Sequence, residues 1–225
     1  MIKNKKILII GGYGFIGKNL YSRLKKTNKV LRFGKTNRTN KKINLKNLKK
    51  IKFNFDIIFY CAGSGTVALS KTNPREDYYR NVISVKETLK YINFFSNKPD
   101  LIFVSSAAVY GNSIKKKKLK PISNYGKNKL LAEQAVIKFC KKKKIRSIIL
   151  RFFSIYGPGL KKQLIWDAIN KFKKKDFTFY GTGNEIRSWM FIDDAIKLII
   201  YSYKKLSTKQ QIFNLSSGEN ITVKA

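Results

Sequence analysis

Short apolar runs and longer amphipathic stretches alternate along the first 155 residues of the chain. Apolar runs of about four to eight residues are typical of buried strands, and apolar positions three or four apart are typical of helices. On this pattern we expect strands at 5–10, 29–33, 56–61, 101–105 and 145–152, and helices at 15–26, 75–96 and 125–143. The alternation of the two kinds of element predicts an α/β fold with a doubly wound parallel sheet.

The pattern loosens after about residue 156. A YGPG segment is followed by an expected helix at 161–173, a strand at 177–180 and a further helix, which we expect the side chain of Asp194 to cap. We therefore divide the chain into a main domain, 1–155, and a partial lobe, 156–225, some of whose strands and helices return to the main sheet.

Composition limits the classes of protein to which the chain can belong. Of its 225 residues 43% are hydrophobic, which is enough for the core of one such domain. No apolar run reaches the ~18 residues of a membrane span, and the apolar N-terminal segment is too short for a signal peptide. Cys61 and Cys140 lie far apart, and histidine is absent. We expect a cytoplasmic protein with reduced thiols, no metal site and no histidine chemistry.

A formal charge of +37 raises the question of nucleic-acid binding. The chain has 41 lysines but only eight arginines, whereas specific base recognition relies on arginine. The lysines are also spread along the chain. We therefore expect no specific nucleic-acid partner and attribute the charge to residue usage.

Four glycines, at positions 11, 12, 14 and 17, separate the first strand from the first helix. They satisfy G-x-G-x-x-G, which allows a tight turn and lets backbone N–H groups approach a pyrophosphate at a helix N-terminus. Because the loop follows an apolar strand and precedes an amphipathic helix, it predicts a Rossmann-like dinucleotide-binding domain.

The acidic residue that usually binds the adenosine ribose about 20 positions later is missing. No Asp or Glu occurs before Asp56, and Gly34 lies near the expected place, followed by Lys35 and Arg38. A cation there suits a 2′-phosphate, so both NAD and NADP stay open as cofactors.

Three Tyr-x-x-x-Lys pairs occur, about as many as chance gives in so lysine-rich a chain: Tyr21/Lys25, Tyr125/Lys129 and Tyr201/Lys205. Only the second pair follows a strand that ends in serine, because Ser105 and Ser106 close the segment LIFVSS. Parallel strands present their carboxyl ends to the ligand crevice, so we expect Ser106 on the cofactor side, with Tyr125 opening the next helix. Lys129 lies one turn along the same helix face.

Short motifs are distributed over nearly the whole chain: GGYGFIG, CAG at 61–63, NV at 81–82, SSAAVYG, YGKNK, LRFF, YGPG, RSWMFIDD and FNLSSGENITV. Together they resemble the motifs of extended short-chain dehydrogenase/reductases of the NAD-dependent epimerase/dehydratase family. The resemblance covers both expected parts of the chain. It implies that 1–155 binds NAD or NADP and that 156–225 is a small, shortened lobe for a nucleotide-sugar substrate.

The resemblance also implies roles for particular residues. Tyr125 exchanges a proton with a sugar hydroxyl while hydride moves to or from the nicotinamide, and Ser106 shares the hydrogen bond to the reacting oxygen. Lys129 holds the nicotinamide ribose, and its positive charge, together with that of the oxidised nicotinamide, pushes the pKa of the phenol down. Arg187 contacts the nucleotide diphosphate, so Ser106 and Arg187 are the expected substrate-binding residues. With Tyr125 and Lys129, the expected cofactor-lining residues are Gly11, Gly14, Phe15, Ile16, Gly17, Asn44, Leu45, Cys61, Ala62, Gly63, Asn81 and Phe153.

The residues after Ser106 bear on the reaction. Dehydratases of the family carry an Asp-Glu pair there, whereas this chain has Ala107 and Ala108. We therefore expect a nucleotide-sugar 4-epimerase, with an NADPH-dependent 4-keto-sugar reductase as the alternative. From another class, an inactive family member that binds nucleic acid stays open. The resemblance further implies a homodimer, paired through helices 75–96 and 125–143.

Overall fold

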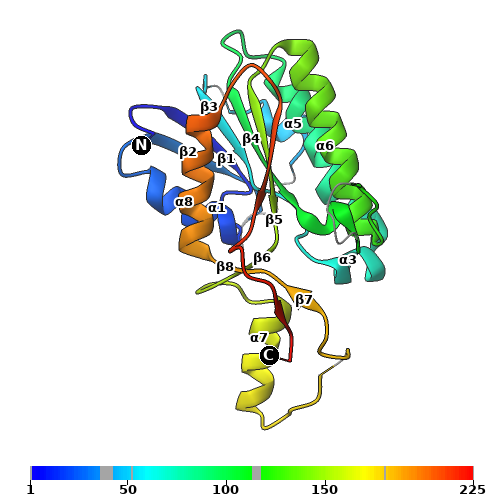
Figure 1. Ribbon diagram of the computed structural model, residues 1–225. Coiled ribbons are helices and arrows are strands. Elements are labelled where there is room, and N and C mark those ends of the chain that lie inside the picture. Colours follow the sequence, from blue (N-terminus) through cyan, green and yellow to red (C-terminus); the bar gives the residue numbers. More distant parts are fainter. Residues whose placement is uncertain (1, 36–42, 52, 113–117, 180, 225) are drawn as a thin grey trace.

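The computed structural model describes residues 2–35, 43–51, 53–112, 118–179 and 181–224. Helices cover both faces of one sheet, with α1 (Phe15–Leu24) and α8 (Ile192–Ser202) on one side and α5 (Ser84–Ile92) and α6 (Asn124–Lys143) on the other (Figure 1). A lobe that carries α7 (Gln163–Lys173) projects from one end of this layered body. Among the described residues, no helix has the length and apolar character needed to cross a membrane.

The main sheet has six parallel strands in the order β2-β1-β3-β4-β5-β9. They are β1 (Lys6–Ile10), β2 (Lys29–Phe33), β3 (Ile57–Tyr60), β4 (Asp100–Ser106), β5 (Ser147–Phe152) and β9 (Gln211–Leu215). The central strands are nearly continuous buried runs because helices cover both of their faces, whereas the edge strands β2 and β9 alternate in burial. The expected doubly wound parallel sheet is confirmed.

The remaining helices are α2 (Leu45–Leu48), α3 (Val67–Thr72), α4 (Pro74–Tyr78), a π-helix η1 (Tyr79–Ile83), and the 3-10 turns η2 (Ala107–Tyr110) and η3 (Tyr203–Lys205). The helix expected at 75–96 is thus three consecutive elements, α4, η1 and α5, and ends at Ile92. The π-turn inside it was not expected. Such turns disrupt the regular ladder and often occur at functional sites.

Two small two-stranded sheets lie outside the main sheet. Strand β6 (Ser154–Tyr156) pairs parallel with β8 (Trp189–Phe191), and β7 (Ile186–Arg187) pairs antiparallel with β10 (Ile221–Thr222). The strand expected at 177–180 is wrong over 177–179, and residue 180 lies outside the described residues. There the rings of Phe177 and Phe179 pack against Phe172 of α7, at centroid distances of 5.7 and 5.8 Å.

The expected cap of α8 is also wrong. The N-cap residue is Phe191, and no side chain caps this end. Because Phe191 also ends β8, the strand runs directly into the helix. Asp194 lies within the first turn, where its carboxylate pairs with Lys197 at 2.9 Å.

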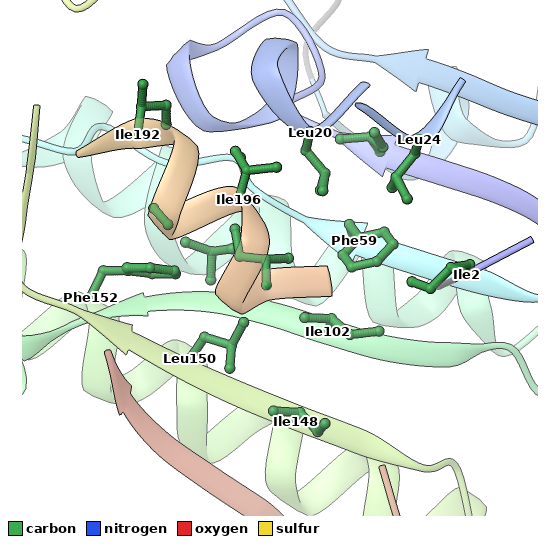
Figure 2. Close-up of a cluster of buried hydrophobic side chains, with 14 of the residues drawn as sticks. Ile2, Leu20, Leu24, Phe59, Ile102, Ile148, Leu150, Phe152, Ile192 and Ile196 are labelled. Atoms are coloured by element: carbon green, nitrogen blue, oxygen red, sulfur yellow. The ribbon is translucent and has the colours of Figure 1, made fainter. Parts of the chain in front are cut away.

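Successive residues of the central strands enter two separate cores, one on each face of the sheet. Ile102 and Leu150 face the α1/α8 layer, where they meet Leu20 and Ile196 (Figure 2). Phe103 and Ile149 face the α5/α6 layer, where the cluster contains Val85, Leu89, Ala132 and Val136. The apolar side chains of α6 therefore pack largely within this chain's own core.

Candidate active site

The glycine loop lies where the strand order reverses, because β1 is flanked by β2 on one side and β3 on the other. Its Gly11 and Gly12 amides donate to the Phe33 carbonyl oxygen at 2.7 and 3.3 Å. A Cβ on Gly11, whose φ is +79°, would lie 2.6 Å from the amide nitrogen of Ala62, and one on Gly17 would lie 2.3 Å from the Gly11 oxygen. Only glycine lets the three backbones approach so closely.

The N-terminus of α1 opens onto this loop. Gly14 is the N-cap residue in extended conformation, without a side-chain cap, and the first turn holds no acidic residue. The amides of Phe15, Ile16 and Gly17 are those that a helix leaves without intrahelical acceptors. A side-chain-free cradle with a positive dipole end fits the pyrophosphate of a nicotinamide dinucleotide.

The other expected cofactor-lining residues lie directly after β3 and β5, at the start of α2 and in η1. Asn44 caps α2, its Oδ1 accepting from the Asn47 amide at 2.9 Å, and the Leu45 amide donates to Glu87 at 2.9 Å. The Asn44 side chain and the Leu45 backbone amide therefore have structural bonds of their own.

Directly after β3, the Cys61 amide donates to Ile10 at 2.8 Å, and burial raises the pKa of the Cys61 thiol to about 12. Ala62 and Gly63 follow it, beside the glycine loop. Phe153 follows β5, and its amide donates to Leu215 of β9 at 3.3 Å. The ends of β1, β3 and β5 thus surround one region of the sheet edge.

Ser106 and Tyr125 are brought together where β4 ends and α6 begins. Ser106 is the last residue of β4, and its hydroxyl accepts from the Ala108 amide at 3.2 Å. The same hydroxyl lies near enough to the Tyr125 phenol to lower the pKa of that phenol. Ser123 caps α6 by accepting from the Gly126 amide at 3.1 Å. A Cβ on Gly126 would lie only 2.4 Å from the Ala108 carbonyl oxygen, so this glycine allows the close approach that places Tyr125 beside Ser106.

Lys129 lies one turn further along α6 and is only 4% exposed. Its Nζ donates to the Val104 carbonyl oxygen at 2.8 Å and lies over the Phe103 ring, 4.7 Å from the centroid. Burial lowers the pKa of Lys129 to about 8, opposed by the negative charge of nearby Glu133. Lys129 is therefore a buried cation held near the end of β4.

Burial raises the pKa of the Tyr125 phenol to about 12, with a further rise from Asp77 and a lowering by the Ser106 hydrogen bond. The lowering expected from Lys129 and the oxidised nicotinamide together stays a prediction, and the chain by itself holds this pKa above its ordinary value. The physical reason is that desolvation of the phenolate outweighs the hydrogen bond that favours it. Tyr125 consequently holds its proton at neutral pH.

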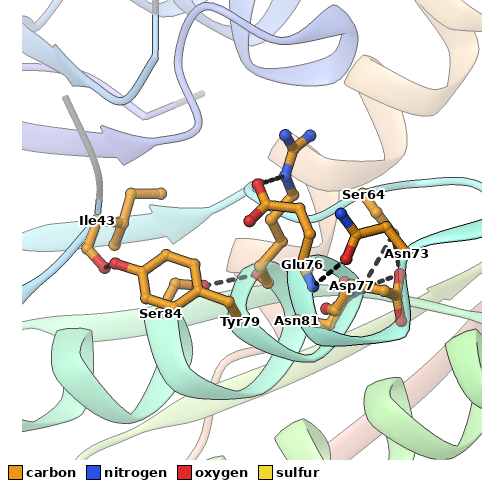
Figure 3. A network of polar contacts seen from close by, with 9 residues as sticks. Ile43, Ser64, Asn73, Glu76, Asp77, Tyr79, Asn81 and Ser84 are labelled. Atoms are coloured by element: carbon orange, nitrogen blue, oxygen red, sulfur yellow. Dashed lines mark hydrogen bonds and ion pairs between the residues drawn. The ribbon is translucent and has the colours of Figure 1, made fainter. Parts of the chain in front are cut away.

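Asn81 lies in the π-turn within a buried polar cluster that the sequence did not indicate (Figure 3). Asp77 accepts from Ser64 at 2.6 Å, from Asn81 at 2.9 Å and from Asn128 of α6 at 2.8 Å. The Asn81 Oδ1 atom is buried without a hydrogen-bond partner among the described residues. It faces Gly63, where an added Cβ would be 2.8 Å away.

A second buried cluster lies one turn beyond Lys129. Glu133 accepts from Ser105 at 2.5 Å and from Arg151 of β5 at 2.6 Å, and Arg151 also donates to the Tyr110 hydroxyl at 2.7 Å. The sequence held a signal that could have found it. Tyr125, Lys129 and Glu133 are spaced by four, which puts all three on one helix face.

The other two Tyr-x-x-x-Lys pairs lie elsewhere. The Lys25 amide donates to the Tyr21 carbonyl oxygen at 3.0 Å, and Lys25 Nζ lies over the Tyr21 ring, 5.5 Å from the centroid. Tyr201 of α8 is 53% exposed. Neither has the buried lysine and the serine partner of the Tyr125/Lys129 pair.

Arg187 lies on β7 in the lobe, exposed, and its guanidinium donates to the Ile186 carbonyl oxygen at 3.3 Å. Among the described residues, no hydrogen bond or ion pair joins Arg187 to Ser106 or Tyr125. Within the same residues, no three His, Cys, Asp or Glu side chains converge so as to hold a metal ion.

Comparison with known proteins finds a matching family model and similar relatives. The model of the NAD dependent epimerase/dehydratase family matches residues 7–216. An uncharacterized UDP-glucose epimerase of Bacillus subtilis is 27% identical over 97% of this chain and 78% of the relative. The UDP-glucose 4-epimerase of Mycoplasma genitalium is 28% identical over 95% of this chain and 76% of the relative.

A solved structure has the same fold. It is a mutant of the UDP-glucuronic acid 4-epimerase from Bacillus cereus, in complex with UDP-4-deoxy-4-fluoro-glucuronic acid and NAD. It superimposes with a TM-score of 0.85 at 22% identity, over 96% of this chain and 79% of that chain.

Proposed function

The chain belongs to the NAD-dependent epimerase/dehydratase family, and on that premise we propose that it is an NAD(P)-dependent nucleotide-sugar 4-epimerase. The observation that carries the proposal is the contact of Ser106 with Tyr125 beside a buried Lys129. The relatives from Bacillus subtilis and Mycoplasma genitalium are named for UDP-glucose epimerisation, which supports a nucleotide sugar as the substrate.

When bound, the dinucleotide supplies a hydride acceptor and, in its oxidised form, a positive charge beside the site. Tyr125 holds the proton that is exchanged at the sugar hydroxyl, and Ser106 stabilises the phenolate by hydrogen bonding. Lys129 adds a buried positive charge and orients the end of β4 through Val104. The glycine cradle and the α1 N-terminus hold the pyrophosphate.

Two alanines argue against dehydration as the reaction. Ala107 and Ala108 begin η2 directly after Ser106, and neither side chain can transfer a proton. Elimination of water needs an additional acid and base, so the proposal excludes a 4,6-dehydratase.

One observation favours a second candidate, an NADPH-dependent 4-keto-sugar reductase. The end of β2 has Gly34 where a ribose-binding acid is usual, as an enzyme specific for NADPH would require. Such an enzyme would use the same Ser106, Tyr125 and Lys129, with proton transfer in one direction only.

We assign Arg187 of the lobe to the substrate diphosphate because a guanidinium can bind it with two parallel hydrogen bonds. The lobe, 156–225, is proposed to bind the sugar nucleotide, and 1–155 the cofactor. A cytoplasmic location and a homodimer remain predictions. Both described cysteines are free thiols, as a reducing compartment requires.

The direct test supplies the purified protein with NAD or NADP and UDP-glucose, and measures UDP-galactose. UDP-N-acetylglucosamine and UDP-glucuronic acid are tested in parallel. Interconversion of any such pair supports the epimerase. Oxidation of NADPH by a nucleotide 4-keto sugar, without epimerisation, would replace it by the reductase. Failure to bind either dinucleotide in calorimetry would refute both.

A further inference from the structure

Arg32, the penultimate residue of edge strand β2, is held by two aromatic rings. Its guanidinium carbon lies 4.5 Å from the ring centroid of Tyr13, in the glycine loop, and 4.0 Å from that of Tyr21, in α1. The side chain is partly exposed and takes part in no ion pair among the described residues. Stacking fixes the plane of the guanidinium while leaving its N–H edge able to donate.

The side-chain stem of Arg32 lies directly against the dinucleotide-binding loop. The Gly11 and Gly12 amides donate to Phe33, the residue after Arg32. A Cβ on Gly12 would lie 2.8 Å from the Cβ and Cγ atoms of Arg32. The stem of Arg32 therefore packs against the loop backbone, and its position is coupled to that of any bound pyrophosphate.

Among the described residues, no carboxylate forms an ion pair with Arg32. The first acidic residue in the sequence is Asp56. Its carboxylate accepts from the Lys6 amide at 2.7 Å, at the start of β1, whereas Arg32 lies near the end of β2. Gly34 stands close to the loop, and Lys35 is exposed beside it. Arg38 lies outside the described residues.

NAD and NADP differ at this place by one group, the 2′-phosphate of the adenosine ribose. A 2′-hydroxyl is normally held by a carboxylate, whereas a phosphate dianion needs a cation with several N–H donors. We propose that Arg32, oriented by Tyr13 and Tyr21, binds the 2′-phosphate and makes the protein select NADP over NAD. This inference rests on the proposed function, since it concerns the cofactor of the same site.

Calorimetric titration separates this role from a purely structural stacking of Arg32 on the sheet edge. The ligands are NAD and NADP, and also 5′-AMP and adenosine 2′,5′-bisphosphate, which isolate the 2′-phosphate from the nicotinamide. All titrations use one ionic strength, because a chain of charge +37 attracts any polyanion at low salt. The expected preference of the unmodified protein for each 2′-phosphorylated ligand is roughly tenfold or more.

Arg32→Leu is expected to abolish that preference by weakening NADP binding roughly tenfold, while NAD binding stays within about threefold. Arg32→Lys keeps the charge but loses the planar fork, and should retain part of the preference. Tyr13→Leu removes one stacking ring and should lower it. Arg23→Leu is the matched control, since it removes an exposed arginine from the last turn of α1 and should leave the preference intact.

Each outcome decides between the two proposals. Equal or tighter binding of NAD by the unmodified protein would overturn the role of Arg32 and leave the epimerase standing. A preference for NADP that survives in Arg32→Leu would also overturn it. Failure of all four ligands to bind would refute the proposed function itself.

Discussion

Glu133 of α6 and Arg151 of β5 form the most enclosed ion pair among the described residues. Their side chains are 1% and 8% exposed, and Nη2 of Arg151 lies 2.6 Å from Oε2 of Glu133. The pair joins the helix that carries Tyr125 and Lys129 to the strand next to β4. Breaking a buried ion pair is costly, because the charge that remains, here that of Arg151, is left without a carboxylate partner and with little water around it.

We therefore expect Glu133→Gln to lower the free energy of unfolding by about 3–5 kcal/mol in a denaturant titration. Glu76→Gln is the matched control. It breaks the Glu76–Arg80 pair, which is about 40% exposed on both sides, and should cost about 1 kcal/mol or less. Equal losses in the two variants would contradict a special role for the buried pair.

Tyr125→Phe removes the hydroxyl that contacts Ser106 and is expected to abolish turnover of the nucleotide sugar. Binding of the dinucleotide should change little, because the glycine cradle is untouched. Turnover is measured by product formation and binding by calorimetry. In Tyr201→Phe, the corresponding change in an exposed pair, turnover should stay within about threefold. Full activity of Tyr125→Phe would exclude the acid/base role.

The buried Lys129 predicts a particular pH dependence. Its pKa is lowered from 10.5 to about 8, so below pH 8 the folded state carries the full cost of a buried charge. Between pH 8 and 10.5 the folded state releases this proton while the unfolded chain keeps it. Stability relative to Lys129→Met must therefore rise with pH across this window, by about 3 kcal/mol.

Urea unfolding of the protein and of Lys129→Met at pH 7, 8, 9 and 10 checks this window. The other lysines titrate in both proteins and cancel in the difference. A constant or falling difference would show that Lys129 is not a desolvated cation. Lys129→Met should also weaken dinucleotide binding, if the residue holds the nicotinamide ribose as proposed.

A homodimer paired through helices 75–96 and 125–143, as expected, would have to use their exposed residues. Val82, Leu89 and Val136 are at most 6% exposed and belong to this chain's core. On the same face of the molecule, Leu131 of α6 is 45% exposed, and Phe94 after α5 is 61% exposed. If the dimer forms through these helices, Leu131→Glu should convert it to monomer in sedimentation experiments. Ile169→Glu, at a 46% exposed position of α7, should not. A monomeric unmodified protein at micromolar concentration would reject the dimer.

Several features of the fold and the site follow from residues close together in the sequence. The apolar runs at 6–10 and 147–152 could be identified as strands because parallel strands are buried on both faces. The glycine loop and the order of Ser106, Tyr125 and Lys129 could be interpreted because strand ends and helix starts meet at the sheet edge. In each case the decisive information lies within about one strand, one turn and one helix.

Only the tertiary structure decided which distant polar groups meet. Asp77 and Asn128 are 51 residues apart, and Glu133 and Arg151 are 18 apart, yet both pairs are buried contacts. The raised pKa of Tyr125 depends on the surroundings of the phenol, and the stack of Arg32 depends on where β2 lies against α1. Local periodicity depends on sequence neighbours, so it can be predicted from them. Desolvation and charge pairing depend on every element packed around a group, so they are set only when the chain has folded.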